Sequence, residues 1–371
     1  MKKILFLLLA ISIVSCKKTE KKVEETSKPK VKLHQLVGGT IFVKKLEVFS
    51  QDSTYKGQTK EFTDTYYVIE HPKGNLMWDA GLPEQFVMPE PFDEPSGVFR
   101  IQRPDSLANQ LNSIGFKKDD FKYFAMSHSH FDHTGHANYM KDATWIVQEN
   151  EYNSVLGDSL KTKNPAVAAL KNVKKIKGDY DVFGDGTVVI KYMPGHTVGH
   201  QVLYVDLGLE KPILLAGDLY HFKENREHKR VPSFNYDVKQ TLESMEKFEA
   251  FAKEKNAEVI IQHSPQDFLK LQEILAKNKT SSPKIFEGEF VYVADAASFT
   301  DCKTGKIYSI TGNEDYILLQ KAYLNADHET YEPEWVKVSG ELKMGEKMNG
   351  GLEEQLVISK FISLDENKKC N

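Results

Sequence analysis

Residues 128–133 read His-Ser-His-Phe-Asp-His and are separated from the apolar run 123–126 by Ser127 alone. Three imidazoles and one carboxylate therefore fall within six residues at the end of a predicted buried strand. Imidazole nitrogen and carboxylate oxygen are the usual ligands of zinc in proteins. Six residues cannot wrap all four groups around one ion and still leave room for a substrate. The segment therefore predicts a site in which two metal ions share one loop.

Three further candidate ligands stand at the ends of later β-prone runs: His196 in Met-Pro-Gly-His, Asp218 in Leu-Ala-Gly-Asp and His263 in Ile-Gln-His. Strand ends that deliver ligands to one edge of a sheet suit an active site on a rigid scaffold. A lone buried histidine is more often a packing residue than a ligand, but seven candidates in this order indicate a metal centre. His136 and His200 fall outside the pattern, and we interpret them as residues that support the ligands or the loops.

The chain around these motifs alternates β-prone runs with a few helical segments. Residues 38–50 and 63–71 alternate apolar and polar positions, which predicts strands with one buried face. Residues 104–115 predict a helix that ends at its glycine, and Asp237 is placed to cap a longer helix. Strands in runs with helices between them predict a fold of α/β class, in which two sheets carry helices on their outer faces.

After the polar stretch 276–284 the pattern changes to β-prone runs broken by turn residues. Five such runs predict a small all-β barrel of the OB type over residues 284–366. We find no metal-ligand cluster in this part of the sequence and no basic or aromatic stripe, so we expect a docking or stabilising module without an assigned ligand. The five runs are 289–299, 306–310, 315–324, 334–344 and 353–364.

The N-terminus predicts export. Lys2 and Lys3 precede an apolar run at 4–14 that is too short to span a bilayer, so residues 1–15 are expected to be a signal peptide. Ile-Val-Ser-Cys at 13–16 looks like a bacterial lipobox, in which Cys16 is lipidated, with an ordinary secretory signal as the alternative. Residues 16–34 are mostly charged, so a flexible linker would follow. We therefore expect a lipoprotein anchored by lipid to a membrane of the cell envelope, periplasmic or in the outer membrane.

Composition fits a globular protein and excludes one class of partner. The 371 residues are 27% charged and 40% hydrophobic, with a formal net charge of −4. A nucleic-acid partner would require a basic surplus, so we expect none. Besides the predicted lipidation site only Cys302 and Cys370 remain; they can pair in an oxidising envelope, and the sequence leaves that pairing and the oligomeric state open.

Over roughly residues 38–270 the sequence resembles the metallo-β-lactamase superfamily, from Asp-Ala-Gly at 79–81 through the histidine loop to the last histidine. The resemblance implies an αββα sandwich over residues 35–280 and two metal ions, zinc or another divalent metal such as iron or manganese. It implies one metal on His128, His130 and His196, a second on Asp132, His133 and His263, Asp218 and a hydroxide bridging both, and a structural role for Asp79.

Residues 178–205 and 218–252 look like the N-acyl homoserine lactonase branch of that superfamily, the quorum-quenching enzymes. The resemblance implies hydrolysis of the lactone ring of a small acyl lactone, with Asp132 as a candidate proton donor. Those enzymes usually place a tyrosine three residues after the bridging aspartate. This sequence has His221 at that offset with Tyr220 beside it, so we take both as catalytic candidates. An imidazole can donate a hydrogen bond to a developing oxyanion as a phenol does.

Alternative functions remain on the same fold and in another class. A thioesterase of glyoxalase II type or a general esterase would use the same metals, but basic residues for the glutathione carboxylates cannot be placed. A β-lactamase is disfavoured by the segment after Asp218. The C-terminal region resembles OB-type domains of bacterial envelope lipoproteins, so an envelope binding or sensing lipoprotein is the alternative outside enzymes.

Overall fold

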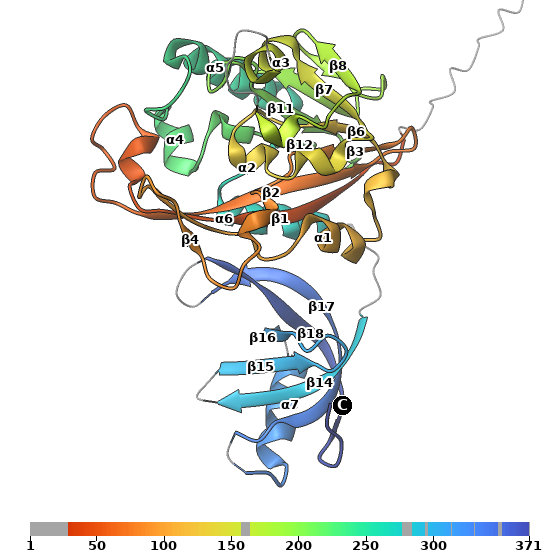
Figure 1. Ribbon diagram of the computed structural model, residues 1–371. Coiled ribbons are helices and arrows are strands. Elements are labelled where there is room, and N and C mark those ends of the chain that lie inside the picture. Colours follow the sequence, from red (N-terminus) through yellow and green to blue (C-terminus); the bar gives the residue numbers. More distant parts are fainter. Residues whose placement is uncertain are drawn as a thin grey trace, which may run out of the picture.

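The computed structural model describes residues 29–156, 164–276, 284–293, 296–312, 314–329, 331–347 and 351–370. The predicted signal peptide, Cys16 and most of the predicted linker lie outside the described residues. Within these ranges the chain forms an α/β sandwich followed by a β-barrel (Figure 1). No helix of the described ranges combines the length and the apolar content that a membrane crossing requires.

The first layer of the sandwich is an eight-stranded sheet with the order β4-β5-β1-β2-β3-β6-β7-β8. Its first half is antiparallel, whereas β3, β6, β7 and β8 run parallel to one another. The strands are β1 (Lys32–Val43), β2 (Lys60–Glu70), β3 (Asn75–Trp78), β4 (Phe92–Asp93), β5 (Phe99–Gln102), β6 (Phe121–Ala125), β7 (Thr144–Gln148) and β8 (Val173–Ile176).

The second layer is a five-stranded sheet with the order β13-β12-β11-β10-β9. A core of fully buried side chains joins the two sheets, among them Trp78 and Ile146 from the first and Ile190 and Leu203 from the second. Burial of such side chains provides the main favourable term in folding. The strands are β9 (Tyr180–Asp181), β10 (Val188–Tyr192), β11 (Gln201–Val205), β12 (Ile213–Leu215) and β13 (Glu258–Ile260).

Helices cover the outer faces, which confirms the predicted αββα sandwich (Figure 1). Leu107 and Leu111 of the first helix pack on the first sheet, and Met245 and Phe248 of the longest helix pack on the second. As predicted, the Asp237 carboxylate caps that helix by accepting from the Gln240 N–H at 2.9 Å. The helices are α1 (Leu107–Ser113), α2 (Phe131–Thr134), α3 (Glu149–Leu156), α4 (Lys223–His228), α5 (Val238–Lys255) and α6 (Pro265–Ala276).

One predicted strand segment is wrong in its second half and another is wrong throughout. The strand expected over 38–50 ends at Val43, and Leu46–Phe49 forms a 3-10 turn, because burying Leu46 and Phe49 together requires a spacing of three. The segment 315–324 lies in a helix, α7 (Glu314–Asn325). Its buried residues Leu319 and Tyr323 are four apart, which places them on one helical face against the barrel core.

The C-terminal unit is a closed barrel with the order β14-β15-β16-β18-β17, which confirms the predicted small β-barrel. Five strands still result because the segment 289–299 supplies two antiparallel strands, paired through Val293 and Ala296. The strands are β14 (Lys284–Val293), β15 (Ala296–Asp301), β16 (Ile307–Gly312), β17 (Glu334–Glu346) and β18 (Leu352–Asp365).

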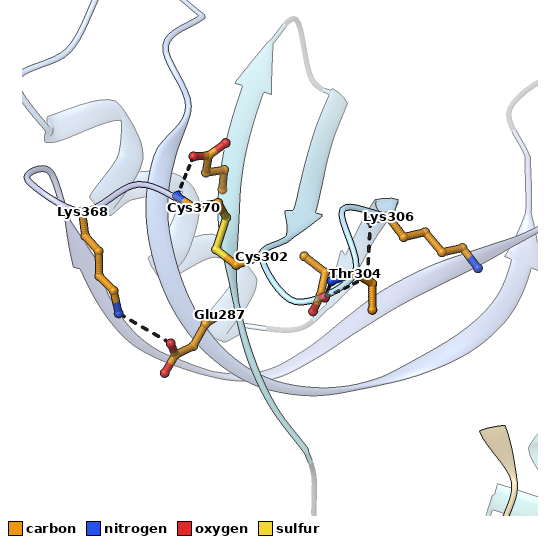
Figure 2. The surroundings of a disulfide bond; sticks show 8 residues. Glu287, Cys302, Thr304, Lys306, Lys368 and Cys370 are labelled. Atoms are coloured by element: carbon orange, nitrogen blue, oxygen red, sulfur yellow. Dashed lines mark hydrogen bonds and ion pairs between the residues drawn. A yellow bond between two sulfur atoms is a disulfide. The ribbon is translucent and has the colours of Figure 1, made fainter. Parts of the chain in front are cut away.

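A disulfide and a pair of hydrogen bonds fix the ends of the barrel. Cys302 and Cys370 form the disulfide, which ties the C-terminal tail to the end of β15 (Figure 2). Beside it Lys368 pairs with Glu287 at 3.5 Å. On the sandwich side, the Gln272 side chain of α6 bonds the N–H and the carbonyl of Met344 in β17, at 2.9 and 2.8 Å. The long β17–β18 hairpin therefore contacts the sandwich directly (Figure 1).

Candidate active site

The seven predicted metal ligands converge at one edge of the sandwich and form two groups. The loop 128–133 leaves the end of β6 and runs into α2, while the other three ligands follow β10, β12 and β13 of the second sheet. In the first group, His130 Nδ1 lies 2.9 Å from His128 Nε2 and 3.1 Å from His196 Nε2. The second group comprises Asp132, His133 and His263. All ligand atoms within a group lie within 4.8 Å of one another.

Asp218 lies between the two groups. Its Oδ1 is 3.2 Å from His133 Nε2 and 3.0 Å from His263 Nε2, both in the second group. Its Oδ2 is 3.5 Å from His128 Nε2 and 3.4 Å from His196 Nε2, both in the first. One carboxylate oxygen thus faces each group, which is the arrangement expected of a residue that bridges two ions.

The donor set fits a pair of cations. Although they lie 3.2 Å apart, His133 Nε2 and Asp218 Oδ1 are buried and neither makes a hydrogen bond of good geometry, and a buried polar atom left in this way is costly unless a ligand satisfies it. Burial lowers the pKa of His128 well below its usual value and that of His130 to about 4, so both rings are neutral at pH 7 and free to bind a metal. Although burial opposes it, Asp218 raises the pKa of His263 to about 9, so metal binding at this ring must displace a proton.

Buried residues around the site hydrogen-bond the ligands and fix the orientation of their rings. The Asp79 carboxylate lies 3.2 Å from His133 Nδ1 and accepts from the Ser127 N–H at 2.6 Å, the supporting position expected for it. His263 Nδ1 lies 2.8 Å from the Thr63 carbonyl. His200 Nε2 accepts from the Asp218 N–H at 3.0 Å, so His200 supports a ligand, whereas His136 pairs with Glu84 at 2.6 Å.

Two buried charged residues that the sequence did not single out hold the ligand loops. Glu151 of α3 accepts main-chain hydrogen bonds from Ser129 and Gly199. The Arg103 guanidinium donates to the carbonyls of Ala80, Leu82 and Asp105 around the turn that carries Asp79. Neither residue lies in a recognisable motif, and the only local signal is a glutamate in the first turn of a helix that follows a buried strand.

An apolar cavity of about 420 Å³ opens above the ligands. His130, Asp132, Asp218 and His263 form its base. The walls are almost entirely aliphatic and aromatic, with one serine: Ile41, Val48, Phe49, Phe62, Val98, Phe99, Phe131, Ser233 and Phe234. A chamber that is apolar except at one polar end suits a substrate with a polar head and a hydrocarbon chain.

The structure separates the two catalytic candidates that follow Asp218. His221 lines the cavity, with its Nε2 3.1 Å from Asp218 Oδ2 and its ring stacked on His263 at 5.7 Å. Burial lowers the pKa of His221, so the ring is neutral. Tyr220 does not belong to the site. Its hydroxyl donates to Glu249 of α5 at 2.9 Å, and its ring packs on Phe248 in the core beneath the second sheet.

Comparison with known proteins agrees with this geometry. Residues 61–263 match the metallo-beta-lactamase superfamily, and residues 280–371 match the NlpE C-terminal OB domain. N-acyl homoserine lactonase AttM of Rhizobium radiobacter is 30% identical over 249 residues, which cover 63% of this chain and 94% of AttM. N-acyl homoserine lactonase AiiA of Bacillus thuringiensis subsp. kurstaki is 31% identical over 202 residues, which cover 53% of this chain and 79% of AiiA.

A solved structure of similar fold is an N-acyl homoserine lactone hydrolase with its product N-hexanoyl-L-homoserine bound at the catalytic metal centre. It is 27% identical, with a TM-score of 0.56, and the match covers 65% of this chain and 96% of that one. The match of more than half of the chain, the two ligand groups and the αββα layers all lead to the same assignment. The chain is a hydrolase of the metallo-beta-lactamase superfamily that carries a C-terminal OB domain.

Proposed function

We propose that the protein hydrolyses the lactone ring of N-acyl homoserine lactones and thereby quenches quorum-sensing signals. The observation that carries the proposal is the complete pair of ligand groups at the base of an apolar cavity. An N-acyl homoserine lactone has a polar ring and amide at one end and a hydrocarbon chain at the other. The similarity to the lactonases AttM and AiiA supports the same substrate class.

The ligand pattern also supports the chemistry. When bound, the two metal ions supply an activated water and polarise a carbonyl. The aromatic walls orient the acyl chain and exclude bulk water from the base of the cavity. His221 is proposed to donate a hydrogen bond to the carbonyl oxygen as negative charge develops on it, because its buried ring reaches the cavity. Asp132, also in the cavity lining, is proposed to take up the proton that the attacking water loses and to pass it to the ring oxygen as the ester bond breaks.

The test is ring opening by the purified, metal-loaded protein, followed as proton release with short- and long-chain acyl homoserine lactones. Turnover that disappears in His128→Ala supports a metal-dependent lactonase. A protein that holds two metals and leaves every lactone intact would contradict the proposal, and hydrolysis of thioesters or simple esters instead would favour the esterase alternative. His221→Tyr should retain more turnover than His221→Phe, because only tyrosine keeps a hydrogen-bond donor.

The proposal includes the metal and the location of the protein. We propose zinc at both positions because His and Asp ligands suit it, with iron or manganese as the alternatives. Elemental analysis of protein purified without added metal distinguishes them. The lipobox-like sequence before Cys16 supports lipid anchoring in the cell envelope. Cys16→Ala should move the protein from the membrane fraction to the soluble fraction, and an unchanged distribution would contradict the anchor.

A further inference from the structure

Glu151 lies at the junction of the two loops that carry the first metal group. It belongs to the first turn of α3, directly after β7, and its side chain is buried. One loop carries His128 and His130, and the other carries His196. These loops leave different sheets, so nothing in the strand pairing sets the distance between their tips.

The Glu151 carboxylate bonds both loops at once. Its Oε1 accepts from the Ser129 N–H at 2.8 Å, and Ser129 stands between the two histidines of the first loop. Its Oε2 accepts from the Gly199 N–H at 2.8 Å, in the turn that begins with His196. Hydrogen bonds between a carboxylate and main-chain N–H groups are short and strong compared with neutral ones.

Close packing against the second loop fixes the position of the carboxylate. A Cβ added at Gly199 would lie 2.5 Å from the Glu151 Cβ and 2.8 Å from the Glu151 nitrogen, so only glycine fits there. Nearer the strands, Gln201 already joins the bases of the loops, since its N–H donates to the Ser127 carbonyl and its side chain to the Met126 carbonyl, each at 2.9 Å. Glu151 is the contact that reaches the ligand-bearing tips.

We infer that Glu151 is a positioning residue for the first metal group, and that its carboxylate holds His196 at the distance from His128 and His130 that one ion requires. Two donors converge on this side chain, so it must present two acceptors. Glutamine has the same shape but only one oxygen, and in either orientation its NH₂ group opposes a main-chain N–H. Glu151→Gln therefore separates the loop tips while changing little else.

The role of Glu151 is tested by metal binding, without any substrate. A failure of this inference can therefore be told apart from a failure of the proposed lactonase activity. Apoprotein is titrated with Co²⁺ and followed by its visible absorption, with chelator competition for affinity. His263→Ala leaves the first group intact, and His196→Ala leaves the second. Glu151→Gln should weaken binding roughly 10- to 100-fold in the His263→Ala background and less than about threefold in the His196→Ala background. Glu151→Asp keeps two acceptors on a shorter arm and should give an intermediate loss.

The control is Glu334→Gln, which alters a buried glutamate of the barrel and should leave both affinities unchanged. Unchanged Co²⁺ affinity in Glu151→Gln, or an equal loss in both backgrounds, would overturn the inference and leave Glu151 as a residue of general stability. If Glu151→Gln does not fold, Gly199→Ala provides the second variant, because it keeps the carboxylate and displaces the loop. It should show the same selective loss, and wild-type affinity in Gly199→Ala would overturn the inference equally.

Discussion

Arg103 is a fully buried cation beside the metal loop, and Arg103→Met removes its hydrogen bonds while keeping an unbranched apolar side chain. Its Nη1 donates to the Ala80 carbonyl at 3.2 Å and to the Leu82 carbonyl, and its Nε donates to the Asp105 carbonyl at 3.0 Å. Within the turn that these bonds hold, Asp79 has a φ of 61°. A non-glycine residue in this left-handed region costs about 1–3 kcal/mol and persists only when its surroundings enforce it.

The magnitude follows from the number of contacts. Three hydrogen bonds from a charged donor contribute roughly 4.5–9 kcal/mol at about 1.5–3 kcal/mol each. Burial of the guanidinium costs several kcal/mol, and methionine avoids that cost. We therefore expect Arg103→Met to lower the free energy of unfolding by about 3–5 kcal/mol. The same variant should weaken metal binding at the second group, because the Ala80 N–H bonds the His133 carbonyl at 2.9 Å.

Urea unfolding of the metal-free protein measures the loss. Trp78 and Trp145 are buried in the sandwich, and Trp335 lies in the barrel, so a Trp335→Phe background restricts the fluorescence signal to the sandwich. Arg226→Met is the matched control: its guanidinium pairs with Glu249 at 2.8 Å but is partly exposed, so a loss of about 1 kcal/mol is expected. A loss in Arg103→Met no larger than that of the control would refute the argument.

Three further predictions concern positions outside the ligand set. Gly195→Ala should lower the free energy of unfolding by about 2–4 kcal/mol, because the backbone there has a φ of +130° and the added Cβ would lie 2.3 Å from the Thr241 nitrogen. A urea stability equal to that of the wild type would contradict this. Replacing both Cys302 and Cys370 by serine removes a cross-link between residues 68 apart and should destabilise the barrel by about 4 kcal/mol in thermal unfolding, with lactone turnover retained. Although burial opposes it, hydrogen bonds from Thr187 and Lys73 lower the pKa of Asp185 from 3.8 to about 2. The contribution of the ionised Asp185 to the free energy of unfolding is therefore complete above pH 4 and is lost as the pH falls through 2. Asp185→Asn should therefore cost about 2 kcal/mol at pH 7 and roughly half of that at pH 3 in urea unfolding, and a pH-independent difference would contradict the assignment.

The ligand set could be predicted from the sequence because the ligands stand at or shortly after the ends of β-prone runs, and the strand ends of both sheets meet at one edge of the sandwich. Tyr220 and His221 could not be separated in this way. Tyr220 is extended, with φ −138° and ψ 135°, and neighbouring side chains of an extended segment point to opposite sides. Only the packing of α5 shows which of the two faces the metals.

Glu151 and Arg103 could not be predicted for a different reason. They bind main-chain groups, and a main-chain N–H or carbonyl carries no residue identity that a sequence pattern can show. The partners of Glu151 are also distant in sequence, 22 and 48 positions away. The segment 315–324 was misread because its apolar residues fit a strand as well as a helix, and only contact with the barrel core distinguishes the two.

The ligands come from both layers of the sandwich, and this affects the stability of the folded protein. The loop 128–133 follows β6 of the first sheet, whereas His196, Asp218 and His263 follow strands of the second. A bound metal pair therefore cross-links the two halves of the fold. Because a ligand that binds only the folded state stabilises it by mass action, metal supply should set the resistance of the sandwich to heat and proteolysis. Scarcity of metal would then reduce the amount of the protein as well as its activity.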